Sequence, residues 1–382
     1  MRRRVSLGGG RRETDRGDRG EPFHRSGASD DSAGGFPERA GAHARYLPRG
    51  VDVVNPHVDR PVEPIDPETC RSSLQILRAL GRCSFQGRNL SRALEVLENM
   101  HADEECGVVL CLAGAMVPAG MGEVVCRLME RGVVQAVVST GANLSHDLVN
   151  AAAGGPGHFL GDPEADDDEL YSLRINRIYD TNLPEDNYHA AEVLLEEIWR
   201  DVAGGSDRLE MPPSEVFRLT GKGLRERGRR SILSVAEERK IPVFCGATSD
   251  SEFCLNFAKF RHRGWLHLVM DEIEDLFRFG AWIRSHERRG TLIVGGGVPR
   301  NWAQQIFPLL DMIEDVTYSG YDYGVRICTD TMVYGGMSGC TLSESKSWGK
   351  YASHARYAEV SVDATIGLPF LTAALFDSLD AE

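Results

Sequence analysis

The sequence predicts an α/β protein: a Rossmann-like, doubly wound parallel sheet with helices on both faces, folded as a single large domain. Three features of residues 72–382 indicate this fold: short apolar runs of strand length, helix-like segments that alternate with them, and small or glycine residues where the runs end. An apolar run without polar alternation is typical of a strand buried on both faces, as in parallel sheets covered by helices.

The individual elements follow from hydrophobic periodicity and from helix start and stop signals. Apolar residues spaced three and four apart predict helices, whereas unbroken runs such as Val108–Leu112 predict strands. In chain order, we expect helices near 72–80, 89–100, 121–130, 145–152 and 299–310, strands near 108–112, 133–138, 241–245, 291–294 and 324–328, and an acidic surface loop over 155–170.

The first 71 residues differ in composition from the rest of the chain. Residues 1–45 are rich in Arg, Gly, Asp and Ser and have almost no aliphatic side chains, which predicts a disordered tail. Prolines recur between Pro48 and Pro67, so residues 46–71 are interpreted as an extended linker. Residues 72–382 would then form the folded domain.

The net charge of −14 narrows the class of partner. An acidic protein disfavours nucleic acid as its main partner and favours cationic ligands such as polyamines or basic proteins. No apolar run reaches the roughly 20 residues of a membrane span, and no signal-peptide core is present. The nine cysteines include no C-x-x-C pair, so we expect reduced cysteines in a cytoplasmic protein, and no metal site.

Small residues follow most of the predicted strands. In an open α/β sheet, ligands bind beyond the carboxyl ends of the strands, where glycine lets the backbone approach a phosphate and helix N-termini offer N–H groups. The loops are Ala113–Gly120, Thr140–Asn143, Gly246–Asp250, Gly295–Gly297 and Thr329–Asp330. Each alone is equally typical of a turn. Together they predict a dinucleotide site, with Asp250 and Asp363 as candidate acceptors for ribose hydroxyl groups.

Lysine is rare in this chain, which has five lysines among its 43 basic residues. Two of them, Lys346 and Lys350, fall in the segment Ser338–Lys350 beside Trp348. A desolvated amine can lose its proton and attack a carbonyl or imine carbon, whereas a guanidinium cannot. Composition alone fits a nucleophilic lysine and a pair of solvated surface lysines equally well.

The segment around Lys350 carries a helix start signal. Thr341 and Glu344 have the spacing of a capping box, which predicts a helix that begins directly after Thr341. In a straight helix Trp348 and Lys350 would point about 200° apart, at roughly 100° per residue, and could not line one pocket. We therefore expect this helix to end or kink near Gly349.

Several segments resemble one known family. Ser343–Lys350 resembles the E-x-x-S-W-G-K signature of deoxyhypusine synthases, and Thr140–Asn143 resembles the nucleotide loop of bacterial and homospermidine-forming relatives. The resemblance covers roughly residues 72–375. Further blocks similar to the family occur in its order at Ile175–Ile178, Ile241–Phe244, Gly295–Val298, Tyr321–Tyr323 and Asp363–Ala364.

The resemblance implies an NAD-dependent transferase that oxidises spermidine beside its secondary amine. The family's nucleophilic lysine, here Lys350, would hold the aminobutyl group as an imine while 1,3-diaminopropane leaves. An acceptor amine, a lysine of translation initiation factor 5A, would then receive the group. Homospermidine synthases use putrescine as the acceptor instead. The family forms homotetramers with sites between paired subunits, which would also hold here.

The resemblance also assigns residues position by position, with Lys350 as the catalytic nucleophile and Lys346 left as a surface residue. Residues that match the family's cofactor contacts are Gly114, Ala115, Thr140, Gly141, Ala142, Asp250, Thr329, Asp330, Asp363 and Ala364. Residues on the substrate side are Gly296, Asn301, Gly335, Gly336, Glu344, Trp348 and His146.

Several positions depart from the family pattern, among them Gly114 and Pro118, where the family usually has serines. Asn301 stands where the eukaryotic enzymes have a histidine proposed as general base. His146, Leu255 and Met337 stand where acids hold the ammonium groups of the polyamine, and losing these charges should weaken the grip on spermidine. His146 is interpreted either as a replacement base or as a surface histidine of a helix.

The leading hypothesis is therefore an aminobutyl transferase that uses Lys350, with a protein lysine or a small amine as acceptor. The alternatives are a homospermidine synthase-like enzyme with putrescine as acceptor, a hydrolase of a guanidino substrate such as agmatine, and a non-catalytic NAD-binding relative. The missing pocket acids favour the non-catalytic relative, whereas the retained Lys350 and Trp348 argue against it.

Overall fold

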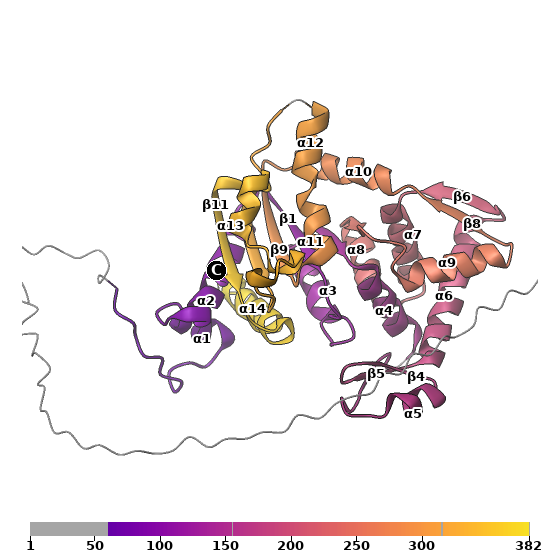
Figure 1. The fold of residues 1–382 in the computed structure, drawn as a ribbon, viewed down its shortest axis with the longest axis horizontal. Helices are drawn as coiled ribbons and strands as arrows, with labels where there is room; N and C mark the ends of the chain where they lie inside the picture. The colour runs from indigo at the N-terminus through magenta and orange to yellow at the C-terminus, as the bar shows by residue number, and fades with distance from the viewer. Residues whose placement is uncertain (1–59, 155, 315, 382) are drawn as a thin grey trace, which may run out of the picture. The chain divides into compact units, whose positions relative to one another are not determined.

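The computed structural model describes residues 60–154, 156–314 and 316–381 (Figure 1). The predicted tail over residues 1–45 lies outside the described residues, as do residues 46–59 of the predicted linker. Residues 60–72 contain no helix or strand, as expected for the end of that linker, and from Arg60 onward the chain forms one compact unit.

Six parallel strands form the central sheet. They are β1 Cys106–Leu112, β2 Ala136–Ser139, β7 Val243–Phe244, β9 Arg288–Val294, β10 Tyr321–Ile327 and β11 Tyr351–Val360. Their order across the sheet is β11-β10-β9-β1-β2-β7, which is 6-5-4-1-2-3 when the strands are counted along the chain. This is the order of doubly wound, dinucleotide-binding sheets, and it reverses between β1 and β9. The predicted Rossmann-like fold is confirmed.

Helices cover both faces of this sheet. Their bounds are α1 Ser73–Leu80, α2 Phe85–Ala102, α3 Gly122–Glu130, α4 Gly141–Ala152, α5 Asp167–Ser172, α6 Glu185–Ala203, α7 Pro213–Glu226, α8 Ile232–Arg239, α9 Glu252–His262, α10 Glu272–Arg284, α11 Gly297–Gln304, α12 Ile306–Glu314, α13 Leu342–Ser345 and α14 Ala364–Leu379. One hydrophobic core contains side chains of α1 to α4, α6 to α9 and α14, and a second core contains those of α10 to α13. Among the described residues, no helix is both long and apolar enough to cross a lipid bilayer.

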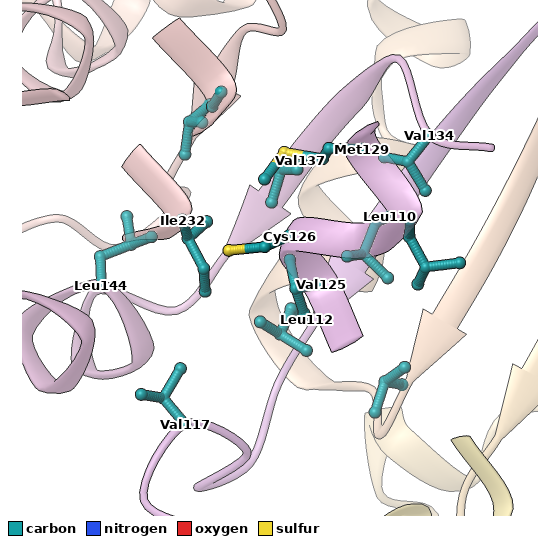
Figure 2. Close-up of a cluster of buried hydrophobic side chains, with 14 of the residues drawn as sticks. Leu110, Leu112, Val117, Val125, Cys126, Met129, Val134, Val137, Leu144 and Ile232 are labelled. Carbon is teal, nitrogen blue, oxygen red and sulfur yellow. The ribbon is translucent and has the colours of Figure 1, made fainter. Parts of the chain in front are cut away.

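The central strand β1 contributes to both cores, which explains its unbroken apolar sequence. Leu110 and Leu112 belong to the first core, whereas Val109 and Cys111 belong to the second, and all four side chains are fully buried. Successive side chains of a strand point to opposite faces, so burial on both faces demands an apolar residue at every position. Figure 2 shows part of the first core, which gathers side chains from α3, α4, α8, β1 and β2.

Two smaller sheets were not predicted. β3 Phe159–Leu160, β5 Thr181–Pro184 and β4 Ile175–Ile178 form an antiparallel sheet in the order β3-β5-β4, and β6 Arg208–Met211 pairs in parallel with β8 His267–Met270. The prediction of an irregular acidic loop over residues 155–170 was wrong in part, because this stretch contains β3 and the first turn of α5. Acidic residues occupy that turn, where they favour the positive end of the helix dipole.

Two predicted helix boundaries also differ from the structure. α4 begins at Gly141 instead of near 145, because the Thr140 side chain accepts a hydrogen bond from the N–H of Asn143 and caps the helix. The single helix predicted over 299–310 is divided into α11 and α12. Pro308 lacks the N–H that would bond to the carbonyl group of Gln304, so one continuous helix is disfavoured there.

Candidate active site

The carboxyl ends of the central strands lie along one line, because the residue after each strand bonds to a neighbouring strand. Four backbone hydrogen bonds of 2.8 to 3.0 Å do this: Thr140 N–H to Leu112 O, Ala113 N–H to Val294 O, Gly295 N–H to Ile327 O and Cys328 N–H to Val360 O. The following loops therefore start along one edge of the sheet, on both sides of the reversal where doubly wound sheets bind ligands.

Asn143 joins the loop after β1 to the start of α4. Its Nδ2 donates to Gly114 O at 2.9 Å, and its Oδ1 accepts from the N–H of Val117 at 3.1 Å. The same side chain also donates to Thr140 Oγ1 at 3.1 Å. Because Asn143 is buried, these bonds fix two of the predicted cofactor loops against each other.

Gly141 brings the loop after β7 to the same place. A Cβ at Gly141 would lie 2.4 Å from Ser251 Cβ and 3.5 Å from Asp250 O, so a larger residue could not approach this loop so closely. The N-terminus of α4, which offers free N–H groups to an anion, begins here. The predicted cofactor residues on this side are Gly114, Ala115, Thr140, Gly141, Ala142 and Asp250.

The other predicted cofactor residues lie beyond β10 and β11. They are Thr329, Asp330, Asp363 and Ala364. Asp363 caps α14 by accepting hydrogen bonds from Thr365 Oγ1 at 2.5 Å and Thr365 N–H at 2.8 Å, and these bonds lower the pKa of Asp363. Because β7 and β11 are opposite edges of the sheet, five strand spacings of about 4.8 Å place Asp250 and Asp363 roughly 24 Å apart, whereas Gly114 and Thr329 follow strands that are only two spacings apart.

These two groups fit an extended dinucleotide such as NAD. A ligand that contacts both must cross the strand reversal between β1 and β9, and NAD carries two phosphates and two riboses in one extended molecule. The N-termini of α4 and α11 both meet this edge, and Gly297, with φ of 59°, leaves open space where a Cβ would stand. Asp250 and Asp363 offer carboxylates of the kind that bind ribose hydroxyl groups.

The segment that carries Lys350 folds as predicted. After α13 ends, a single 3₁₀ turn covers Lys346–Trp348, and Gly349 has a φ of 69°, in the left-handed region. A left-handed glycine commonly terminates a helix, so the prediction of a break near Gly349 is confirmed. Lys350 Nζ then lies 5.7 Å from the centroid of the Trp348 ring, and both side chains can line one space.

The Lys350 amine contacts an amide in place of a carboxylate. Its Nζ donates to Oδ1 of Asn301, on α11, at 3.2 Å. The side chain is half-buried, and burial is the main cause that lowers the pKa of Lys350. The Cys340 thiol opposes this effect, while the positive charge of Arg300 adds to it. Burial therefore shifts the amine toward its neutral form, whose lone pair can attack an electrophile.

The backbone of Lys350 is held on both sides. Its N–H donates to Ser345 O at 3.2 Å, and its carbonyl oxygen accepts from the N–H of Tyr321 at 3.0 Å. The close approach of these two segments of the chain requires a glycine before Tyr321, since a Cβ at Gly320 would lie 2.6 Å from the Lys350 carbonyl carbon. The next residue, Tyr351, is buried, with its hydroxyl 2.6 Å from Thr291 Oγ1.

Several predicted substrate residues border open space within this chain. No atom lies within 4 Å of where a Cβ would stand at Gly335 or Gly336, and Glu344 is exposed. Trp348 is 65% exposed, so only one side of the space around Lys350 is enclosed by the described residues. Gly296, by contrast, is tightly enclosed, because a Cβ there would lie 2.5 Å from Ser338 Cα.

His146, on α4, forms a pair with His158, which lies after that helix. Its Nδ1 lies 3.0 Å from Nε2 of His158, whose Nδ1 lies 2.8 Å from Asn150 Oδ1. Burial, and then the charge of His158, lower the pKa of His146 to about 4, so the ring is neutral at physiological pH. The interpretation as a surface histidine was wrong, since the ring is half-buried. A role as base remains a prediction.

The sequence did not point to the residues that hold the lysine segment in place. Arg300 and Arg326 are almost fully buried and bond to carbonyl groups of residues 337–341, but arginine is so common in this chain that neither stood out. Lys346, which was assigned to the solvated surface, is partly exposed. Its Nζ donates to Ser353 O at 3.0 Å and lies 5.1 Å from the centroid of the Tyr357 ring.

A family model and several known proteins that match this chain all carry the same family name. A sequence model of "Deoxyhypusine synthase" matches residues 75–375. "Probable deoxyhypusine synthase 2" of Methanosarcina acetivorans is 34% identical over 325 residues, which are 85% of this chain and 92% of that protein. "Probable deoxyhypusine synthase 1" of Archaeoglobus fulgidus is 36% identical over 79% of this chain and 93% of its own length.

A bacterial relative and a solved structure extend the comparison. The "Deoxyhypusine synthase-like protein" of Chlorobaculum parvum is 32% identical over 79% of this chain and 86% of that protein. The crystal structure of a "putative deoxyhypusine synthase" from Entamoeba histolytica superposes with a TM-score of 0.55 at 17% identity, covering 83% of this chain and 97% of that one. At this identity the superposition concerns the fold alone.

Proposed function

The chain belongs to the deoxyhypusine synthase family, and on that basis we propose that it is an NAD-dependent transferase of aminobutyl groups. The donor is spermidine or a related polyamine, and the group passes through an imine on Lys350 to an acceptor amine. The observation that carries this proposal is the half-buried Lys350, bound to Asn301 and next to Trp348, in a chain whose central sheet has the strand order of dinucleotide-binding folds.

The surroundings of Lys350 suit a nucleophile. Attack on an imine carbon requires a neutral amine, and the burial that lowers the pKa of Lys350 increases the neutral fraction near pH 7. Asn301 accepts one N–H of the amine without adding negative charge. It therefore orients Nζ while leaving the lone pair free, whereas a carboxylate at the same place would favour the ammonium form.

Trp348 supports a cationic substrate. Its ring faces Lys350 Nζ and is 65% exposed, so its free surface can receive the ammonium chain of a polyamine. An ammonium group over a tryptophan face gains about 0.5 to 2 kcal/mol, depending on how far it is desolvated. Glu344, exposed one turn earlier, can add a counter-charge.

NAD, when bound, would supply the hydride acceptor for the first half of the reaction and return the hydride in the second. The residues that would hold it are the two groups along the carboxyl edge, from Gly114 and Thr140 at one end to Asp363 at the other. The protein side of the chemistry is then performed by Lys350, which forms the bond to the aminobutyl carbon as the C–N bond to the leaving diamine breaks.

The acceptor is proposed to be a protein lysine or a small amine such as putrescine. We also propose a homotetramer, as the family implies. The open side of the site supports this proposal, because Met332, Val333 and Tyr334 expose apolar side chains beside the Lys350 segment and a second subunit would cover them. The mass of the purified protein in solution, measured by light scattering, tests the assembly.

Borohydride trapping tests the transferase. The full chain is incubated with NAD and, in parallel, with spermidine, putrescine or agmatine, then reduced and digested for mass spectrometry. We expect an aminobutyl adduct on Lys350 with at least one amine, and none in Lys350→Arg. Lys346→Arg is the matched control, because this lysine lies four residues away and bonds to Ser353; it should keep the adduct.

Three outcomes separate the proposal from its competitors. Labelled donor carbons that move to putrescine identify a small-amine acceptor, and labelled carbons that move to a protein lysine identify a protein acceptor. Release of urea from agmatine without an adduct on Lys350 would instead support the guanidino hydrolase. Absence of any adduct together with absence of NAD binding would contradict the transferase.

A further inference from the structure

We propose that Arg300 is a positioning residue for Lys350: its buried guanidinium fixes the backbone segment from which the lysine extends and adds a positive charge that, among the described residues, has no carboxylate within ion-pair distance. The inference rests on the proposed nucleophilic role of Lys350 and adds to it a residue that none of the sequence motifs identified. It is argued from the contacts of Arg300, from their connection to the lysine backbone and from a comparison with Arg326.

Arg300 is one of the most completely buried side chains in the protein. It lies on α11, directly before Asn301, and is 1% exposed. Its Nη1 donates to the carbonyl oxygens of Cys340 and, at 3.4 Å, Met337, and its Nη2 donates to Ser345 Oγ at 3.0 Å and Thr341 O at 3.4 Å. Burying a guanidinium is costly unless its N–H groups are bonded, and every one of these acceptors belongs to residues 337–345.

These bonds lead directly to Lys350. The hydroxyl group of Ser345 accepts from Arg300, and the carbonyl group of the same Ser345 accepts the backbone N–H of Lys350 at 3.2 Å. Asn301 meanwhile binds the amine at the far end of the side chain. Two consecutive residues of α11 therefore hold the lysine at its backbone and at its tip, and together they fix the direction of the side chain.

Arg326 holds the same segment but has a counter-charge. Its Nη1 donates to Ser338 O at 2.6 Å and Cys340 O at 2.9 Å, and its Nε lies 3.1 Å from Glu359 Oε1. That carboxylate also accepts the N–H of Leu342 at the start of α13. Among the described residues, by contrast, no carboxylate lies within ion-pair distance of Arg300, whose contacts are all neutral.

The difference between the two arginines separates two effects. Both fix the backbone of residues 337–341, but only Arg300 leaves a positive charge without a carboxylate beside it. A nearby positive charge disfavours a second one, so Arg300 favours the neutral amine and lowers the pKa of Lys350. Loss of either arginine should misplace the lysine, whereas loss of Arg300 alone should also change its protonation.

The experiment measures two pH profiles for the full chain and for Arg300→Met, Arg300→Lys and Arg326→Met. One is the rate at which the borohydride-trapped adduct forms on Lys350 with NAD and the donor amine. The other is the rate at which an amine-acylating reagent modifies Lys350 without NAD, read by mass spectrometry with Lys346 as internal reference. The second profile reports protonation whether or not the transfer reaction occurs.

We expect Arg300→Met to lower the adduct rate roughly tenfold to a hundredfold and to move both profiles to higher pH. Arg300→Lys should have the pH midpoint of the unmodified protein but a lower rate, since it keeps the positive charge and loses the planar set of N–H donors. Arg326→Met should lower the rate with its midpoint unchanged. If Arg300→Met does not fold, as judged by circular dichroism, Arg300→Gln takes its place, since it removes the charge and keeps two N–H donors.

Two results would overturn the inference while leaving the transferase intact. One is an unshifted acylation midpoint in Arg300→Met, and the other is an adduct rate in Arg300→Lys equal to that of the unmodified protein. Failure of the proposed function looks different, because the unmodified protein itself would then form no adduct on Lys350. In that case the acylation profiles still test whether Arg300 controls the protonation of Lys350.

Discussion

Asn301 decides at the scale of a single residue how reactive the neighbouring lysine can be. Its amide oxygen accepts from Lys350 Nζ at 3.2 Å without bringing a negative charge to the amine. Burial then lowers the pKa of Lys350, because no contacting carboxylate among the described residues offsets the cost of desolvating the ammonium form. The choice of amide over carboxylate at this position therefore matters more than the hydrogen bond itself.

Replacement of this amide by a carboxylate should make the Lys350 amine much less nucleophilic near neutral pH. In Asn301→Asp, an ion pair at about the same distance would raise the pKa of Lys350, since an adjacent opposite charge favours the ammonium form. We expect the rate of adduct formation at pH 7 to fall about tenfold or more and to recover at alkaline pH.

Asn301→Ala is the matched control for this prediction. It removes the orientation of Nζ without adding charge, so its rate should fall at every pH with no alkaline recovery. The pH dependence of the trapped adduct, measured between pH 6 and pH 10, distinguishes the two variants. Equal midpoints for both variants would contradict the electrostatic role of the amide.

At the scale of elements, the junction between α13 and β11 presents Lys350. The left-handed Gly349 ends the 3₁₀ turn, and the lysine backbone then bonds to Ser345 on one side and to Tyr321 at the start of β10 on the other. The close approach of these two chain segments depends on Gly320, which is buried and has a φ of 82°. A lysine placed in this way has a fixed backbone at the amino ends of β10 and β11.

Gly320→Ala should damage both stability and reactivity. The new Cβ would lie 2.6 Å from the carbonyl carbon of Lys350 and from the nitrogen of Tyr351, so the backbone at the lysine must move. We expect a loss of about 1 to 3 kcal/mol in the free energy of unfolding, from strain at positive φ, and at least a tenfold loss of adduct. Urea denaturation and borohydride trapping measure the two effects.

Gly264→Ala provides the control for backbone strain. Gly264 also has a positive φ, 75°, but no atom lies within 4 Å of where its Cβ would be. It should lose roughly 1 kcal/mol of stability and keep the adduct on Lys350. Similar adduct yields in the two variants would show that the contact between Gly320 and Lys350 does not position the nucleophile.

At the scale of the whole molecule, buried carboxyl groups join helices that are distant in the sequence. Asp147 on α4 is buried and accepts the N–H of Ile232, at the start of α8, at 2.7 Å. Burial raises the pKa of Asp147 to about 7 even though backbone hydrogen bonds act in the opposite direction. The folded protein therefore takes up this proton more readily than the unfolded chain does.

This shift makes stability depend on pH in a specified direction. Because the pKa of Asp147 is raised in the folded state, its favourable contribution is complete below about pH 4 and is lost as the pH rises toward 7. Asp147→Asn should remove that dependence. Urea denaturation at several values between pH 4.5 and 8 should show the free-energy difference between variant and unmodified protein shifting in favour of the variant as pH rises. A constant difference would contradict the prediction.

The fold was largely predictable because its central strands are buried on both faces. β1 and β9 appear in the sequence as apolar runs, and their alternation with helices predicted a parallel sheet, although not the order of its strands. β11 was missed, since it is an edge strand in which exposed residues such as Ser353 and His354 interrupt the apolar pattern. The short strands β6 and β8 were missed for a related reason, because their residues are only partly buried or exposed.

By itself, the sequence determined the fold class, the family resemblance, the lysine proposed as the nucleophile and the helix break that lets Trp348 and Lys350 share one space. These depend on local pattern, on residue chemistry or on contiguous motifs. Only the tertiary structure decided which residues hold that lysine. Arg300, Arg326 and Gly320 act through contacts with residues 12 to 45 positions away. Such contacts leave no local sequence pattern. A buried arginine, or a glycine that has no room for a Cβ, can be recognised only when the position of the surrounding chain is known.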